Sequence, residues 1–193
     1  MLEGRSIRLR LVREDDLPTL QAFDEDIANR GDFYPLGVVA LPTLAARYAE
    51  SGLWRPSEGL LLITDHGGEL LGHIEFFETV GYLDELELSY LLYSAERRGR
   101  GVATEAVGLL TGYLFDRTKV NRIRLVIHPE NTASRRVAEK AGYTLEGVAR
   151  GAWYHRGHHH DVEVWAMLRA EHRPDGAGRD SAQPDPRLTL DPP

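Results

Sequence analysis

Apolar and polar residues alternate with a period of two in several segments, which predicts strands with one buried face. The clearest cases are residues 6–12 and 85–93, where almost every second side chain is apolar. Residues 59–64 and 70–78 flank a short glycine-containing turn, which predicts a β-hairpin. In chain order the predicted strands are 6–12, 59–64, 70–78, 85–93, 122–127, 143–153 and 161–168.

Other segments carry apolar residues at helical spacing. Leu17, Leu20 and Phe23 recur after an acidic stretch that can cap a helix. Gly142 favours the end of a later helix, because glycine tolerates a left-handed backbone. The predicted helices begin at about Leu17 and then cover 41–48, 104–115 and 131–141. Helices therefore interleave with a mixed sheet, so we expect an α/β or α+β fold with three layers.

The length of 193 residues suits one well-cored domain. Residues near the end are rich in Pro, Gly, Asp and Ser and poor in apolar types. Such a segment cannot bury enough surface to offset its ordering entropy. We therefore expect one domain over residues 1–170 and a disordered tail over residues 171–193.

Composition narrows the classes of partner. The net charge of -7 argues against non-specific nucleic-acid binding, which needs a basic surface. No apolar run approaches the ~20 residues that cross a bilayer, and the first residues lack the apolar core of a signal peptide. The absence of cysteine excludes disulfides, thiolate metal sites and a cysteine nucleophile. We expect a cytoplasmic protein without membrane or nucleic-acid partners.

Residues 97–106 (RRGRGVATEA) join a predicted strand to a predicted helix. Two glycines and three arginines stand where unpaired backbone N–H groups begin a helix, which predicts an anion site. The stretch lacks the lysine of a mononucleotide P-loop. It also lacks the third glycine of a dinucleotide motif, since Thr104 stands there. A phosphorylated ligand of another kind is therefore favoured.

Two ordered strings resemble one family. Arg98, Gly101 and Ala103 fit the Arg/Gln-x-x-Gly-x-Gly/Ala signature of the GNAT superfamily of acetyl-CoA-dependent N-acetyltransferases. Residues 131–143 (NTASRRVAEKAGY) are similar to the Asn-x-x-Ser…Lys-x-Gly-Phe helix of that family. The last strands resemble its ribosomal-protein N-terminal acetyltransferase branch (RimJ/RimL-type). The resemblance covers roughly residues 5 to 170. It implies a mixed, mostly antiparallel central sheet of about seven strands flanked by about four helices.

The resemblance implies that acetyl-CoA is the acetyl donor. Its pyrophosphate would accept hydrogen bonds from the backbone at residues 98–104, where glycine lets the chain approach closely. Its pantetheine arm would add to the preceding strand, and the next helix would lie near the thioester. The expected cofactor-binding residues are Leu91, Leu92, Tyr93, Arg98, Gly99, Arg100, Gly101, Val102, Ala103, Thr104, Asn131 and Ser134.

Acetyl transfer to an amine needs a neutral amine, a stabilised oxyanion and a proton for the departing thiolate. Without a cysteine, direct attack in a ternary complex is the natural mechanism, with the oxyanion held by strand N–H groups near Leu92. Glu87 is the first candidate base and Glu75 the second; each could instead be a solvated or paired carboxylate. By resemblance Ser134 would orient the thiol or relay a proton; it could also simply cap its helix.

The three consecutive residues His158, His159 and His160 raise the question of a metal. Neighbouring strand residues face opposite sides, so only the first and third could share an ion, and no further ligand has suitable spacing. We expect an exposed hairpin turn there and no metal.

The acceptor amine is the least determined part of the prediction. Acidic and aromatic residues in the first helices and their loop would suit a cation, although they could equally be a solvated acidic surface. They are Asp24, Glu25, Asp26, Asp32, Glu50, Phe33, Tyr34 and Trp54. The acceptor could be a protein or peptide N-terminal α-amine, or a small amine such as an antibiotic, a polyamine or an amino acid derivative. A non-catalytic acyl-CoA-binding protein is the third alternative, and a homodimer is plausible.

Overall fold

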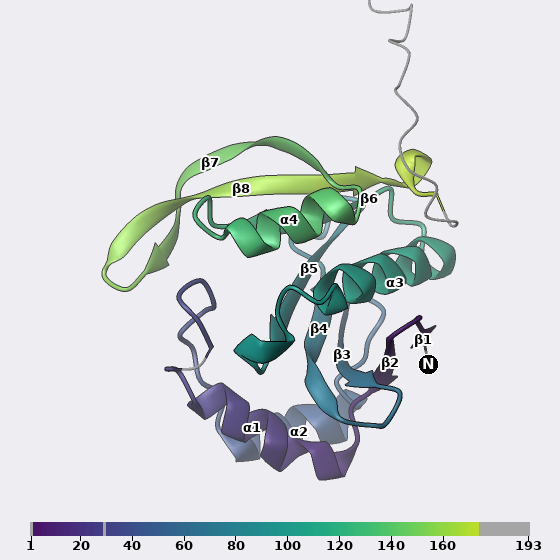
Figure 1. Ribbon diagram of the computed structural model, residues 1–193, viewed down its shortest axis with the longest axis vertical. Coiled ribbons are helices and arrows are strands. Elements are labelled where there is room, and N and C mark those ends of the chain that lie inside the picture. Colours follow the sequence, from purple (N-terminus) through teal and green to yellow (C-terminus); the bar gives the residue numbers. More distant parts are fainter. Residues whose placement is uncertain (1, 29, 174–193) are drawn as a thin grey trace, which may run out of the picture.

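The structure, a computed structural model, describes residues 2–28 and 30–173. Within these residues one eight-stranded sheet has the order β1-β2-β3-β4-β5-β6-β8-β7 (Figure 1). β5 and β6 pair in parallel and all other neighbours pair antiparallel. The strands are β1 (Leu2–Glu3), β2 (Ile7–Leu11), β3 (Glu58–Asp65), β4 (Leu70–Phe77), β5 (Glu85–Leu92), β6 (Arg122–Ile127), β7 (Thr144–His155) and β8 (His158–Leu168).

Helices cover both faces of the sheet and make three layers (Figure 1). α1 (Leu17–Glu25) and α2 (Leu41–Ser51) pack on one face, and α3 (Val102–Arg117) packs on the other beside α4 (Thr132–Lys140). The expected three-layer mixed fold with four helices is confirmed.

Alternation along β3 shows how the sequence divides its side chains between the layers. Ile63 packs in the core under α3, whereas Leu62 packs with residues of α1 and α2. Both side chains are fully buried, and each such burial stabilises the fold by roughly 1.5–3 kcal/mol. A shift of one residue in the pairing would exchange the two faces, so the apolar pattern fixes the register.

The structure differs from the predicted elements at both ends of the chain. β1 adds an eighth strand; its two residues are too short to show alternation. The last hairpin turns at Arg156 and Gly157, both at positive φ, so β7 and β8 run longer than expected. The histidines therefore belong to β8, not to the turn, which corrects the expected exposed turn. The expected tail lies outside the described residues from position 174 onward and stays a prediction, as does the domain boundary at residue 170.

The lengths and compositions of the helices bear on the expectation that the protein does not span a membrane. No helix in the described part of the chain is long and apolar enough to cross a bilayer.

Candidate active site

The glycine-rich loop before α3 presents free backbone to one point. Gly99 and Gly101 have φ of 75° and 85°, in the left-handed region that favours glycine. Gly101 is the N-cap of α3 and supplies no side-chain acceptor, so the first N–H groups of the helix are available. The space where a Cβ would lie is open at both glycines. The backbone here is open to an anion, and its role as the site for the CoA phosphates stays a prediction.

The three arginines around this loop have different roles. Arg97 pairs with Glu69 at 2.5 Å, which connects the loop to the residue that precedes β4. Arg98 and Arg100 are exposed, and neither forms an ion pair with another described residue. The guanidinium of Arg98 lies beside Gly31, since a Cβ there would be 3.7 Å from its Nη2. Two arginines thus remain for an anionic ligand.

β5 and β6 separate beyond their first residues, and we call this unpaired part the splay. Their ladder has three registers, from Glu85–Arg122 to Glu87–Arg124, although both strands continue. The N–H of Tyr93 donates to Leu71 in the direction of β4, over 3.0 Å. Because successive N–H groups alternate in direction, the N–H of Leu92 points into the splay. The splay can therefore accept an extended arm as an added strand.

Gly72 of β4 permits this arrangement, and the sequence analysis did not identify it. A Cβ on Gly72 would lie 2.1 Å from the carbonyl oxygen of Leu91. Only glycine allows β5 to approach β4 so closely at the level of the splay. Nothing in the local sequence signals this contact, because Leu91 is distant along the chain.

The N-terminus of α4 lies on the other side of the splay. Asn131 is its N-cap, and its Oδ1 accepts from the N–H of Ser134 over 3.1 Å. The Ser134 Oγ accepts from the hydroxyl of Tyr90 on β5, also over 3.1 Å. The two predicted residues of this helix are thus brought together, and Tyr90 joins them.

A cavity of about 190 Å³ lies between the sheet, α1, α2 and the loop that connects these helices. It is on the face of the sheet opposite α3 and α4, and the side chains of Leu91 and Tyr93 form part of its wall. Its charged lining residues are Asp24, Arg30 and Glu75. The other lining residues are Leu20, Phe23, Tyr34, Val39, Leu44, Leu60, Leu91, Tyr93 and His73.

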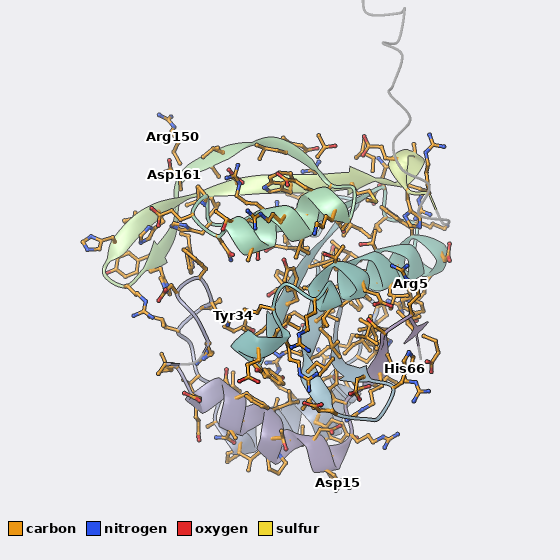
Figure 2. All side chains as sticks on the ribbon, in the orientation of Figure 1. Arg5, Asp15, Tyr34, His66, Arg150 and Asp161 are labelled. Carbon is orange, nitrogen blue, oxygen red and sulfur yellow. The ribbon has the colours of Figure 1, made fainter. Side chains whose placement is uncertain are left out.

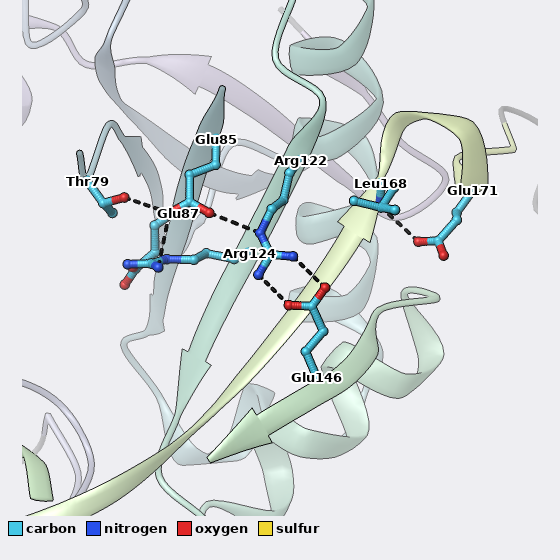
Figure 3. A network of polar contacts seen from close by, with 8 residues as sticks. All are labelled: Thr79, Glu85, Glu87, Arg122, Arg124, Glu146, Leu168 and Glu171. Atoms are coloured by element: carbon cyan, nitrogen blue, oxygen red, sulfur yellow. Dashed lines mark hydrogen bonds and ion pairs between the residues drawn. The ribbon is translucent and has the colours of Figure 1, made fainter. Parts of the chain in front are cut away.

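The two candidate bases, Glu75 and Glu87, share this face of the sheet but have different surroundings. Glu87 accepts from the Nε of Arg124 over 2.9 Å, within the network in Figure 3. Glu75 lines the cavity and has no ion pair with another described residue. Burial raises the pKa of Glu75 above 4.5, although a hydrogen bond with Ser89 and the charge of Arg47 oppose it. Burial likewise raises the pKa of Glu87 against the charge of Arg124.

The ion pairs around Glu87 connect neighbouring strands of the sheet. Arg124 lies between Glu85 and Glu87, and Arg122 bridges Glu85 to Glu146 of β7 (Figure 3). These ion pairs cross β5, β6 and β7 at the end of the sheet where β5 and β6 still pair. Glu87 is thus engaged by Arg124 where the ladder of β5 and β6 ends.

A neutral hydrogen-bonded chain forms another wall of the cavity. The His73 Nε2 lies 2.9 Å from the Tyr34 hydroxyl, and its Nδ1 lies 2.8 Å from the Tyr93 hydroxyl. Burial lowers the pKa of His73 to about 4, so the imidazole is neutral at physiological pH. Figure 2 labels Tyr34 between the connecting loop and the strands. The sequence analysis missed His73, whose only signal is a polar residue inside a strand.

Arg30 shapes the loop that closes the cavity. Its buried guanidinium donates to the carbonyls of Pro35 and Gly37, each over 2.8 Å, and pairs with Asp24 at 3.4 Å. Asp24 also accepts from the N–H of Val39 over 2.6 Å. Both charges are therefore used within the protein.

Part of the expected acceptor surface lies elsewhere. Trp54 packs edge-on against Phe76, with ring centroids 5.2 Å apart, in the core under α3. Glu50 pairs with Arg55 at 2.5 Å. Of the acidic and aromatic residues expected around the acceptor, Asp24 and Tyr34 line the cavity. The reason is that helix direction, which the sequence does not give, separates residues that are close along the chain.

The histidines of the last hairpin form an aromatic cluster. His160 Nδ1 lies 3.2 Å from His128 Nε2, and Phe33 stacks on His128 with centroids 4.9 Å apart. Within the described residues no group of three or more His, Cys, Asp or Glu side chains could hold a metal ion.

Comparison with known proteins agrees with this geometry. The chain matches the family described as "Acetyltransferase (GNAT) domain" over residues 6–144. It is 35% identical over 111 residues to "Probable N-acetyltransferase YjcK" of Bacillus subtilis, covering 57% of this chain and 61% of that protein. It is 31% identical over 106 residues to "Putative ribosomal N-acetyltransferase YdaF" of the same organism, covering 55% and 57%. The chain thus spans about six tenths of the length of these relatives.

A solved structure shows the same fold. A spermidine N-acetyltransferase from Vibrio cholerae, in complex with CoA and spermine, has a TM-score of 0.74 at 18% identity. The likeness covers 87% of this chain and 98% of that chain. Because the family model matches residues 6–144, the chain belongs to the GNAT family of acetyltransferases.

Proposed function

We propose that the acceptor is the α-amine at the N-terminus of a peptide or protein, and that Glu75 is its general base. The observation that carries the proposal is the cavity on the face of β5 opposite α3 and α4, where Glu75 is a buried carboxylate without an ion pair among the described residues. An ammonium group entering this cavity would meet one available negative charge. Burial raises the pKa of Glu75, which brings it closer to the pKa of an α-amine, about 8, than the pKa of an ordinary carboxylate is.

The charge of the cavity favours an acceptor with one cation. Asp24 is engaged by Arg30 and a backbone N–H, and His73 is neutral. A polyamine carries several ammonium groups, and the remaining lining offers no second free carboxylate within the described residues. An α-amine followed by an uncharged chain matches this environment better. The likeness to a relative named as a ribosomal N-acetyltransferase also supports the proposal.

The reaction then follows from where the chain places its groups. Glu75 takes a proton from the ammonium, and the neutral amine attacks the acetyl carbonyl carbon directly. The N–H of Leu92 points into the splay and would stabilise the negative charge that develops on the carbonyl oxygen. Ser134 would donate its hydroxyl proton to the sulfur as the C–S bond breaks, and the second proton lost by the amine nitrogen would return to the serine oxygen through water. Gly99, Gly101 and the first turn of α3 would hold the phosphates.

The small-amine alternative has its own support, because a structural neighbour is named as a spermidine N-acetyltransferase. An amine panel separates the candidates. Purified protein is given acetyl-CoA with N-terminal peptides, their Nα-blocked counterparts carrying a free lysine, spermidine and small monoamines, and thiol release is followed. We expect turnover on the free α-amine peptides, at least about tenfold above the other classes. A preference for spermidine would contradict the proposal. Binding of acetyl-CoA without turnover on any amine would support the non-catalytic alternative.

Assembly is a separate question. The homodimer expected from the family remains a prediction, and sedimentation of the purified protein tests it.

A further inference from the structure

Two hydroxyl groups meet at the splay, and one of them has no part in the reaction described so far. The Tyr90 hydroxyl donates to the Ser134 Oγ over 3.1 Å. Tyr90 belongs to the part of β5 beyond its ladder with β6, and Ser134 is in the first turn of α4. The hydrogen bond therefore connects the donor-binding strand to the helix that carries the proposed proton donor.

This contact determines which way the Ser134 hydroxyl can point. The backbone of Ser134 is fixed, since its N–H donates to Asn131. A hydroxyl has one proton to donate and two acceptor positions. The Tyr90 proton occupies one acceptor position, so the Ser134 proton must point elsewhere. Among the residues that the structure describes, that proton has no acceptor.

Tyr90 can hold this arrangement without changing its own charge. Its ring packs against the core under α3, and burial raises its pKa to about 12. The phenol therefore stays protonated, and remains a donor, throughout the pH range in which an α-amine is acetylated. Tyr90 is thus suited to orient Ser134 and unsuited to supply the transferred proton itself.

We propose that Tyr90 is a positioning residue, which turns the Ser134 hydroxyl toward the sulfur atom of the departing thiolate. This inference rests on the proposed role of Ser134 as proton donor. When the C–S bond breaks, sulfur keeps the electron pair and takes the Ser134 proton, while the second proton lost by the attacking amine reaches the serine oxygen through water. Tyr90 keeps its own proton and its hydrogen bond throughout.

The chain offers a matched control for a test. Tyr90→Phe removes one hydroxyl and leaves the ring. Tyr143→Phe does the same to a buried tyrosine whose hydroxyl lies 2.6 Å from Thr111 Oγ1, in the core between β7 and α3. We expect Tyr90→Phe to lower kcat about tenfold with KM for acetyl-CoA unchanged, because one orienting hydrogen bond is lost. Tyr143→Phe should lower the melting temperature and leave kcat within about twofold of the parent.

A double variant separates positioning from a structural effect. Ser134→Ala alone should lower kcat about 100-fold, and Tyr90→Phe added to it should cost no more than a further ~2-fold, because there is no hydroxyl left to orient. Losses that multiply, or a Tyr90→Phe effect no larger than that of Tyr143→Phe, would overturn the inference. Full kcat in Ser134→Ala would overturn it together with the proton-donor role. All variants are assayed with the best acceptor of the amine panel. Failure of the α-amine assignment would therefore change only the acceptor used.

Discussion

The proposed donor side and the proposed acceptor side of this protein are built in opposite ways. The donor side comes from nearly continuous chain, residues 91–104 with the start of α4, and it presents backbone N–H groups and open glycine positions. The acceptor side brings together side chains from α1, α2, their loop, β3, β4 and β5. The donor side can therefore be recognised from a short motif, and the acceptor side becomes visible only in three dimensions.

Electrostatics divides the two sides in the same way. The donor side has exposed arginines, Arg98 and Arg100, beside the first turn of α3. The acceptor side has two carboxylates within its cavity, Asp24 paired with Arg30 and Glu75 without an ion pair among the described residues. Salt should thus affect donor binding strongly and the proton transfer weakly, since buried charges are screened less. The following substitutions test this division, beginning with one that should damage both sides.

Gly72→Ala should have the largest effect. The new Cβ would lie 2.1 Å from the Leu91 carbonyl oxygen, so β5 must move relative to β4 by about 1 Å. That movement displaces the donor-binding strand and the wall of the acceptor cavity together. Since a misplacement of about 1 Å can cost 100-fold, and this one affects both sides, we expect kcat/KM to fall more than about 100-fold. Steady-state kinetics and CoA binding measure this.

Gly108→Ala is the matched control. Gly108 is exposed in α3 and no atom lies within 4 Å of the Cβ position. Alanine in a helix interior should stabilise the protein by up to about 1 kcal/mol and leave kcat/KM unchanged. If Gly72→Ala behaved like Gly108→Ala, the close approach of β5 to β4 would have no functional meaning.

The sequence predicted elements well wherever periodicity was strong. β6 has the predicted limits, 122–127, because its side chains alternate without interruption. The predicted helix at 131–141 matches α4 with Asn131 as its cap, since capping residues and Gly142 mark both ends. β1 and the tight turn of the last hairpin were not predicted. Two residues carry no period, and polar histidines in β8 resemble a turn.

For the site, the sequence suggests residues for the donor side, which stay a prediction, and few for the acceptor side. Gly99 and Gly101 lie in the loop before α3, Asn131 and Ser134 lie at the start of α4, and each belongs to a local motif. Gly72, His73 and Tyr90 act through partners distant along the chain, and the pairing register that joins them is absent from any window of sequence. The surroundings that distinguish Glu75 from Glu87 also depend on the tertiary fold.

Glu75→Gln compared with Glu87→Gln sharpens the acceptor side. We expect Glu75→Gln to lower kcat/KM about 100-fold, because the amine loses its base. Glu87→Gln should cost less than about threefold, since Arg124 keeps Glu85 as a partner at 3.0 Å. A larger loss in Glu87→Gln than in Glu75→Gln would exchange their roles.

The pH dependence gives an independent measure of Glu75. Burial raises the folded pKa of Glu75 above its ordinary value, so the carboxylate that accepts a proton forms only as pH rises through this raised pKa. Activity should rise with pH over this interval in the parent and lose that dependence in Glu75→Gln. Stability should behave oppositely: the neutral carboxyl contributes fully below the unfolded pKa, and this contribution is lost as pH rises through the folded pKa. The free energy of unfolding, measured with urea, should therefore decrease less between pH 4 and pH 8 in Glu75→Gln than in the parent.

Arg98→Ala tests the donor side and should change the kinetic constants less than the preceding substitutions. Removing one exposed cation beside the glycine-rich loop should raise KM for acetyl-CoA about tenfold at low salt, and this difference should shrink as salt is added. The kcat value should stay within about twofold, since the guanidinium touches no reacting atom. Arg97→Ala is the comparison: Arg97 is paired with Glu69, so its loss should act on loop stability. An equal salt dependence of KM in both variants would remove the distinction between these arginines.

Asp32→Asn should have the smallest effect, although Asp32 connects the loop between α1 and α2 to the last hairpin. Asp32 pairs with Arg156 at the tip of the last hairpin over 3.8 Å, and its side chain is 85% exposed. Such exposed pairs contribute about 0.2–1 kcal/mol, so KM for the acceptor should change by no more than about twofold. Phe33, the next residue, instead stacks on His128 and should matter more when replaced by alanine. Acceptor KM values for both variants decide whether the hairpin is held by packing, as we expect, or by charge. A larger effect of Asp32→Asn than of Phe33→Ala would show that charge holds it.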